Sequence, residues 1–65
     1  MTKRFHSVRE VVEVLGISRT AVYELIRSGE LPSVRMGSAG IRVPTVALEH
    51  YAEAREQEAL SKTAA

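Results

Sequence analysis

The polar side chains between residues 18 and 27 could form hydrogen bonds with a binding partner, because helical spacing would gather them on one side of a short segment. The apolar members of this segment share one face of such a helix: Ala21, Val22, Leu25 and Ile26. The polar members share the other face: Arg19, Thr20, Tyr23, Glu24 and Arg27. Guanidinium and hydroxyl groups at this spacing can hydrogen-bond to base edges and phosphate oxygens. The pattern indicates a helix with a surface made for contact.

Two helices are needed to position that face. The polar segment follows Ser18, a good N-cap residue, and ends at Gly29, where a helix of about three turns should stop. An earlier helix is predicted over residues 8–15, because Ser7 opens a capping box and apolar residues recur at helical spacing. Two short amphipathic helices joined by about three residues through a glycine are typical of a helix-turn-helix.

After Gly29 the hydrophobic period changes to two, which predicts a small hairpin, or wing. Its strands are expected over residues 31–36 and 41–43, and Gly37, Ser38, Ala39 and Gly40 form the turn. Val34 and Met36 are expected to point inward.

The register of this hairpin follows from a four-residue turn. Met36 then faces Ile41, and Arg35 faces Arg42 across the ladder. Like charges directly opposite cost on the order of 0.2 to 1 kcal/mol, unless an anion lies between them. A phosphate group would fit between the two arginines.

A third helix is predicted from Pro44, which favours a first helical turn, to roughly Glu58. Its stripe toward the core comprises Val46, Ala47, Leu48, Tyr51, Ala52 and Arg55. The last residues, S-K-T-A-A, lack a core-forming pattern. We therefore expect one domain over residues 1–60 and a disordered tail over 61–65, whose deletion should leave the fold intact.

Length and composition exclude several classes of protein. A chain of 65 residues has room for one small core and not for an enzyme with a deep cleft. It has no cysteine, and its two histidines, His6 and His50, are far apart in sequence, so neither a metal site nor a cofactor site is expected. No apolar run approaches the roughly 20 residues of a membrane span, and the N-terminus lacks the apolar stretch of a signal peptide. We expect a cytoplasmic protein without a membrane partner.

Charge is divided unevenly along the chain. Residues 1–43 carry seven basic and four acidic side chains, a balance of +3, whereas residues 44–65 carry two basic and four acidic ones, a balance of −2. A basic head and an acidic tail are typical of a polyanion-binding protein, although a difference this small also arises by chance.

Each basic residue has an ordinary interpretation beside the functional one. Arg19 and Arg27 are either ligands of a nucleic acid or solvated charges, and Tyr23 either faces outward or packs at the margin of the core. On the wing, Arg35 and Arg42 either grip phosphate or the minor groove, or keep the ribbon soluble; Ser38 could bond to the backbone at the tip. Lys3 and Arg4 form either a flexible basic arm or merely a soluble start of the chain.

The run L-G-I-S-R-T-A-V-Y-x-L-I-R-x-G-x-L-P, followed by I-R-V-P, resembles the small excisionase-type DNA-binding domains, which are related to the MerR winged-helix proteins. The similarity extends from residue 7 to about residue 51. It implies an α+β, mostly helical fold: a small winged helix-turn-helix with a two-stranded wing and a C-terminal helix. It also implies that the second helix enters the DNA major groove through Ser18, Arg19, Thr20, Tyr23 and Arg27, and that Arg35 and Arg42 make wing contacts. The small tip, Ser38, Ala39 and Gly40, departs from relatives with further basic residues and argues against deep minor-groove insertion.

The resemblance also implies a biological role. A chain of this length without an effector domain looks like a phage or mobile-element excisionase, also called a recombination directionality factor, in a bacterial host cell. Such proteins bind double-stranded DNA near an attachment site, bend it and help the integrase, with cooperation between neighbouring copies. Two alternatives stay open: a small transcriptional regulator, and an integrase-binding adaptor with little affinity for DNA. None of the three is an enzyme.

Overall fold

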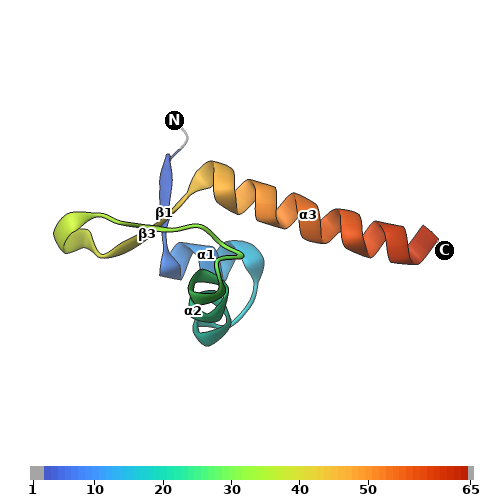
Figure 1. Cartoon of the computed structure of the whole chain (residues 1–65), viewed down its shortest axis with the longest axis horizontal. Helices are drawn as coiled ribbons and strands as arrows, with labels where there is room; N and C mark the ends of the chain where they lie inside the picture. The colour runs from blue at the N-terminus through green and yellow to red at the C-terminus, as the bar shows by residue number, and fades with distance from the viewer. Residues whose placement is uncertain (1–2, 65) are drawn as a thin grey trace.

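Two short helices, a small sheet and one long helix make up the structure (Figure 1). The computed structural model describes residues 3–64, with the side chains of residues 3–62. The elements follow in the order β1 (Phe5–Ser7), α1 (Val8–Leu15), α2 (Arg19–Ser28), β2 (Val34–Arg35), the 3-10 turn η1 (Gly37–Ala39), β3 (Ile41–Pro44) and α3 (Thr45–Ala64). The strands form one antiparallel sheet in the order β1-β3-β2. This arrangement confirms the predicted mostly helical α+β fold, a small winged helix-turn-helix.

The first two helices begin and end where their capping residues predict. At the start of α1 the Ser7 hydroxyl accepts from the Glu10 N–H at 3.2 Å, and the Glu10 carboxylate accepts from the Ser7 N–H at 2.9 Å. Gly16 ends α1 in the left-handed region, with φ of 68°, which glycine adopts without steric cost. At the start of α2 the Ser18 hydroxyl accepts from the Ala21 N–H at 3.1 Å. Local chemistry therefore accounts for both helices.

Within residues 3–62, a core of six buried residues joins the helices to the sheet: Val8, Val11, Val22, Leu31, Val43 and Leu48. Val11 and Val22 are fully buried and hold α1 against α2. Leu31, predicted to lie in a strand, instead lies in the connection after α2. Its N–H donates to the Leu25 carbonyl at 3.1 Å while its side chain is fully buried. This contact ties the start of the wing to the end of α2.

The wing pairs one residue out of the register expected from the sequence. Val34 pairs with Arg42, and Arg35 pairs with Ile41, so the expected pairing of Arg35 with Arg42 is wrong. The reason is η1: the Met36 N–H donates to the Gly40 carbonyl at 2.8 Å, and this closes a five-residue loop that includes Met36. A shift of one residue sends the side chains to opposite faces of the ribbon.

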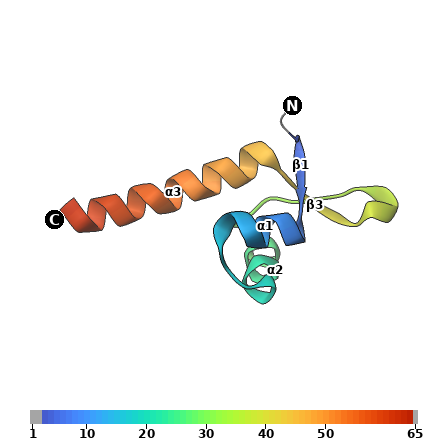
Figure 2. The same ribbon diagram turned by 180° about the vertical axis from the view of Figure 1, so that it is seen from behind.

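The expected inward position of Val34 and Met36 is also wrong. Their side chains are 40% and 41% exposed, because the wing projects away from the helices and β2 is an edge strand (Figures 1 and 2). Among residues 3–64, strand β2 pairs only with β3, and no helix covers it where the wing projects, so neither of these side chains is buried.

A strand that the sequence did not predict, β1, occupies the other edge of the sheet. Phe5 pairs with Pro44 and His6 with Val43. Just before β1, the Arg4 carbonyl accepts from the Thr45 N–H at 2.8 Å, and the Lys3 carbonyl accepts from the Thr45 hydroxyl. These bonds hold the backbone of residues 3 and 4 against the start of α3, so a flexible arm does not describe these two residues.

Helix α3 starts at Thr45, directly after Pro44, which is the last residue of β3. Leu48 is buried and Tyr51 partly buried, as expected, but Val46 is 71% exposed and Arg55 is exposed as well, so their place in the core stripe was wrong. The helix continues to Ala64, well beyond the expected end near Glu58, and projects from the body on the side opposite the wing (Figures 1 and 2).

The length of α3 has a local cause. Its last two turns are rich in alanine, glutamate, leucine and lysine, which are strong helix formers, and this propensity extends the helix without core contacts. Residues 61–64 are therefore helical, while residue 65 of the expected tail lies outside the described part of the chain. No helix within residues 3–64 combines the length and apolar character needed to cross a bilayer.

Candidate nucleic-acid interface

The outer face of α2 is exposed along its whole length. Arg19, Thr20, Tyr23, Glu24 and Arg27 are all exposed. On the opposite face Val22 is fully buried, and Ala21, Leu25 and Ile26 are partly buried. The predicted division of this helix into an apolar and a polar face is thus confirmed.

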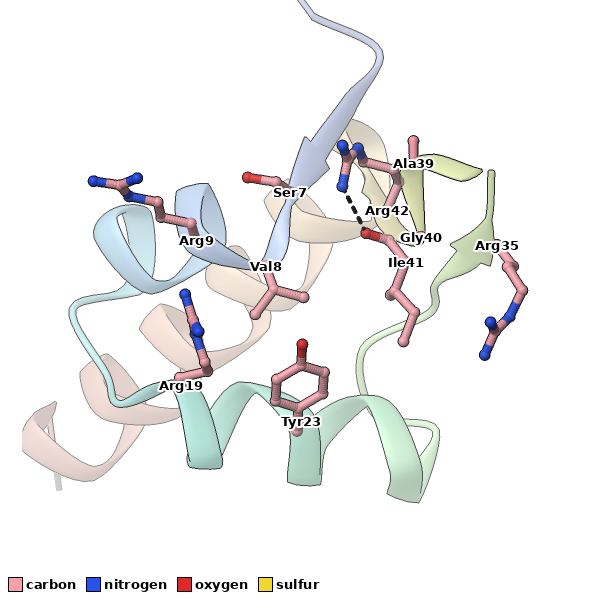
Figure 3. A pocket seen from close by; sticks show the side chains of 10 residues that line it. All are labelled: Ser7, Val8, Arg9, Arg19, Tyr23, Arg35, Ala39, Gly40, Ile41 and Arg42. Atoms are coloured by element: carbon pink, nitrogen blue, oxygen red, sulfur yellow. Dashed lines mark hydrogen bonds between the residues drawn. The ribbon is translucent and has the colours of Figure 1, made fainter. Parts of the chain in front are cut away.

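Beside this face lies an open hollow of about 440 Å³, which we call the basic hollow (Figure 3). Four elements each contribute one arginine to its lining: Arg9 from α1, Arg19 from α2, Arg35 from β2 and Arg42 from β3. The other lining residues are Ser7, Val8, Tyr23, Ala39, Gly40 and Ile41. No lining residue is acidic, so the basic hollow concentrates positive charge.

The side chains that line the basic hollow come from different elements and point in different directions. Arg19 and Tyr23 rise from α2, and the Ile41 side chain descends from β3 toward Tyr23 (Figure 3). The Arg42 guanidinium bends back on its own strand, where its Nη1 donates to the Ile41 carbonyl at 3.1 Å. Among the described residues no carboxylate forms an ion pair with any of the four arginines. Their charges are available to an anion.

The structure therefore brings together four of the residues singled out from the sequence: Arg19, Tyr23, Arg35 and Arg42. The other four lie outside the basic hollow. The Ser18 hydroxyl oxygen serves as the N-cap of α2, and Ser38 lies exposed in η1 at the tip of the wing. Thr20 and Arg27 are exposed on α2 and are not among the residues that line the hollow.

Helix α2 consequently carries two parallel lines of polar side chains. The inner line, Arg19 and Tyr23, is spaced i, i+4 and faces the basic hollow. The outer line, Thr20, Glu24 and Arg27, is spaced i, i+4, i+7 and faces solvent. The inner line therefore lies among basic side chains and the outer line lies in solvent, whereas the sequence predicted a single polar face.

Arg9 is a member of the basic hollow that the sequence analysis missed. It is the second residue of α1, between the two capping-box residues Ser7 and Glu10, and its side chain is exposed. Helical side chains tilt toward the N-terminus, and in a helix-turn-helix the start of α1 lies near α2. The capping box at Ser7 was therefore the signal that could have identified Arg9.

The start of α1 is held in place by Glu10. Its carboxylate accepts a hydrogen bond from the Lys3 ammonium and one from the Ser7 N–H. These bonds, aided by the nearby charges of Lys3 and His6, lower the pKa of Glu10 to about 2 against the opposing effect of desolvation. Glu10 thus stays ionised and links β1 to α1 beside the basic hollow.

This geometry agrees with what sequence comparison shows. Residues 7–56 match the model of a helix-turn-helix domain family. The chain belongs to this family. The family is one of DNA-binding domains and not of enzymes, so residues 7–56 form a DNA-binding domain.

Two curated relatives are similar to the helix-turn-helix domain. A probable excisionase from Saccharopolyspora erythraea is 44% identical over 46 residues, which cover 71% of this chain and 46% of the relative. The uncharacterized protein ORF88 of Enterobacteria phage P4 is 45% identical over 40 residues, which cover 60% of this chain and 46% of that protein. The chain therefore spans about half the length of these relatives. No solved structure gave a significant match.

Proposed function

We propose that this helix-turn-helix domain is an excisionase, or recombination directionality factor, that binds duplex DNA beside an attachment site, bends it and promotes excision by an integrase. The observation that carries its DNA-binding part is the basic hollow, which four arginines from four elements line next to an exposed helix face without an acidic residue in the lining. Such a cluster repels itself unless a polyanion neutralises it.

The two lines of α2 suggest a division of roles on DNA. An α-helix fits the major groove, where the outer line would meet base edges through Thr20 and Arg27. The inner line would meet the sugar-phosphate backbone, because Arg19 shares the basic hollow with Arg9 and the two wing arginines. This narrows our expectation for Arg19, which lies on a face whose side chains could bond to base edges as well as to phosphate oxygens.

The remaining residues complete a backbone clamp. The Tyr23 hydroxyl would donate to a phosphate oxygen from within the hollow, and Ser18 would meet the backbone at the start of α2. Ser38 would do so at the wing tip, where Arg35 and Arg42 accompany it toward the neighbouring minor groove. The small side chains of the tip favour shallow contact there.

The excisionase role is supported by similarity. One relative is named a probable excisionase, and the other comes from a phage. The proposal includes an integrase partner and cooperation between copies, since one small domain reads few base pairs and each good base contact supplies roughly 1 to 3 kcal/mol. The relation to MerR proteins stays a prediction.

A salt titration tests the DNA-binding part. If four arginines neutralise four phosphates, the logarithm of the binding constant for duplex DNA should fall against the logarithm of salt with a slope of about −3 to −4. Arg9→Ala and Arg19→Ala should each reduce the slope by about 1 and weaken all sequences alike. Arg55→Ala, on the exposed part of α3, is the matched control and should change neither quantity.

Two results would contradict this part. One is the absence of duplex binding even in dilute salt, which an adaptor would show. The other is a slope that the two hollow variants leave unchanged.

The excisionase part is tested by recombination with a purified integrase of the host element on attachment-site DNA: excision should require this protein and fall with Arg19→Ala. Binding without any effect on excision would indicate a transcriptional regulator instead.

A further inference from the structure

The outer line of α2 contains an acidic side chain that the fold does not use. Glu24 is exposed, and no hydrogen bond or ion pair joins its carboxylate to another described residue. Arg27, three residues later on the same helix, lies within reach of a helical ion pair but does not form one with it. Glu24 also lies in the second turn of α2, beyond the first turn where a carboxylate benefits most from the helix dipole.

This carboxylate lies where negative charge is unfavourable for the proposed function. If α2 enters the major groove, Glu24 approaches a surface lined by phosphates, and the repulsion lowers affinity for every sequence. A carboxylate is accommodated there only if it accepts a hydrogen bond from a base. In the major groove the amino groups of cytosine and adenine are the donors, and the contact typical of glutamate is with N4 of cytosine.

We propose that Glu24 is a specificity-determining residue that accepts a hydrogen bond from the N4 amino group of a cytosine in the target site. It lies one helical turn after Thr20, so the two side chains address neighbouring base pairs. The inference rests on the proposed function, and it adds a requirement for a C·G pair at one position. Glu24 acts by excluding wrong bases and not by adding affinity, since any other base leaves its charge unpaired.

Selection of bound sequences from a randomised duplex library tests the inference with the full chain. The wild type should enrich cytosine at one position. Glu24→Gln should shift that position toward adenine, because glutamine makes paired hydrogen bonds with N6 and N7 of adenine. Glu24→Ala should lose discrimination at that position by about tenfold while its affinity for random duplex rises. The matched control Glu56→Gln removes an exposed carboxylate from α3 and should select the wild-type sequence.

The possible failures are distinguishable. If the wild type enriches no sequence and binds duplex DNA without salt dependence, the proposed function fails together with the inference. If the wild type selects a sequence that Glu24→Gln selects equally well, the inference alone is overturned. Higher affinity of Glu24→Ala for all sequences, with unchanged preference at every position, would also overturn it. Circular dichroism of the variants should match the wild type, because residue 24 is exposed on a helix that tolerates both substitutions.

Discussion

At the scale of single residues, the basic hollow depends on where individual side chains point. Arg19 and Thr20 are adjacent in sequence, yet one faces the hollow and the other faces solvent. The 100° turn between successive helical residues is enough to separate a phosphate contact from a base contact. Specificity and affinity can therefore be changed independently on one helix.

Glu10 gives a prediction about pH at the same scale. Its pKa is lowered from 4.5 to about 2 in the folded protein, chiefly by the hydrogen bond from Lys3. A carboxyl with a lowered folded pKa contributes stability above pH 4.5, and this contribution is lost as the pH falls toward 2. Replacing Glu10 by glutamine should therefore lower the free energy of unfolding at pH 7 but make little difference at pH 2. Urea denaturation of the wild type and the variant at pH 7 and pH 2 measures the difference in their free energies of unfolding.

The glutamine variant is informative because it keeps the capping box. The glutamine side-chain oxygen can still accept a hydrogen bond from the Ser7 N–H, so the substitution removes only the negative charge that pairs with Lys3. Glu53→Gln, at an exposed position of α3, serves as the control and should follow the wild type at both pH values. An equal loss of stability for Glu10→Gln at pH 2 and pH 7 would show that the charge is not the cause.

At the scale of elements, the wing shows how a turn decides the role of a strand. Because the loop around η1 includes Met36, the register places Arg35 beside Ile41, and both residues then line the basic hollow. A four-residue loop would have paired Arg35 with Arg42 and set two like charges opposite each other. The observed register distributes the two arginines instead.

Helix α3 allows a deletion test of the boundary at residue 60, which stays a prediction. The side chains of residues 53–62 are exposed, so removing residues 61–65 should change the free energy of unfolding by less than about 0.5 kcal/mol. The helical signal in circular dichroism should fall by the amount that corresponds to about one helical turn. Leu48→Ala, at a position only 3% exposed, should in contrast cost about 2 to 5 kcal/mol. A comparable loss from the deletion would mean that the end of α3 supports the fold.

At the scale of the whole molecule, charge is arranged along an elongated shape. The principal extents are 47 × 28 × 18 Å, and the wing and α3 project from opposite sides of the helix pair (Figures 1 and 2). The basic hollow lies between α2 and the wing, whereas exposed glutamates follow α3: Glu49, Glu53, Glu56 and Glu58. Copies bound side by side on DNA could thus place an acidic helix near a basic head, in an open head-to-tail row.

The cooperation that we propose between copies can be tested on this acidic surface. Reversal of Glu49 and Glu53 to lysine should abolish cooperative gel shifts on DNA with several sites while preserving binding to a single site, because both side chains are exposed on α3 and neither residue lines the hollow. Glu13→Lys, on the exposed side of α1, provides a charge-reversal control. Unchanged cooperativity in the double variant would exclude this surface.

The local features of this protein were predictable from its amino-acid sequence. Both short helices, their capping residues and the two faces of α2 follow from interactions between residues at most four apart. Helix propensity also favoured the extension of α3 to Ala64, but we predicted an end near Glu58 because the last residues lack a core-forming pattern. Arg19 and Tyr23 could therefore be named as site residues without coordinates.

Features that depend on contacts between distant segments could be seen only in the folded chain. Strand β1 has three residues and exists because β3, nearly forty residues later, pairs with it. The register of the wing depended on the closure of η1, and Arg9 joined the site because helix packing brought the start of α1 beside α2 and the sheet. Hydrophobic periodicity records which side of an element is buried, but not which other element covers it. For that reason the exposed face was predictable and the four-arginine hollow was not.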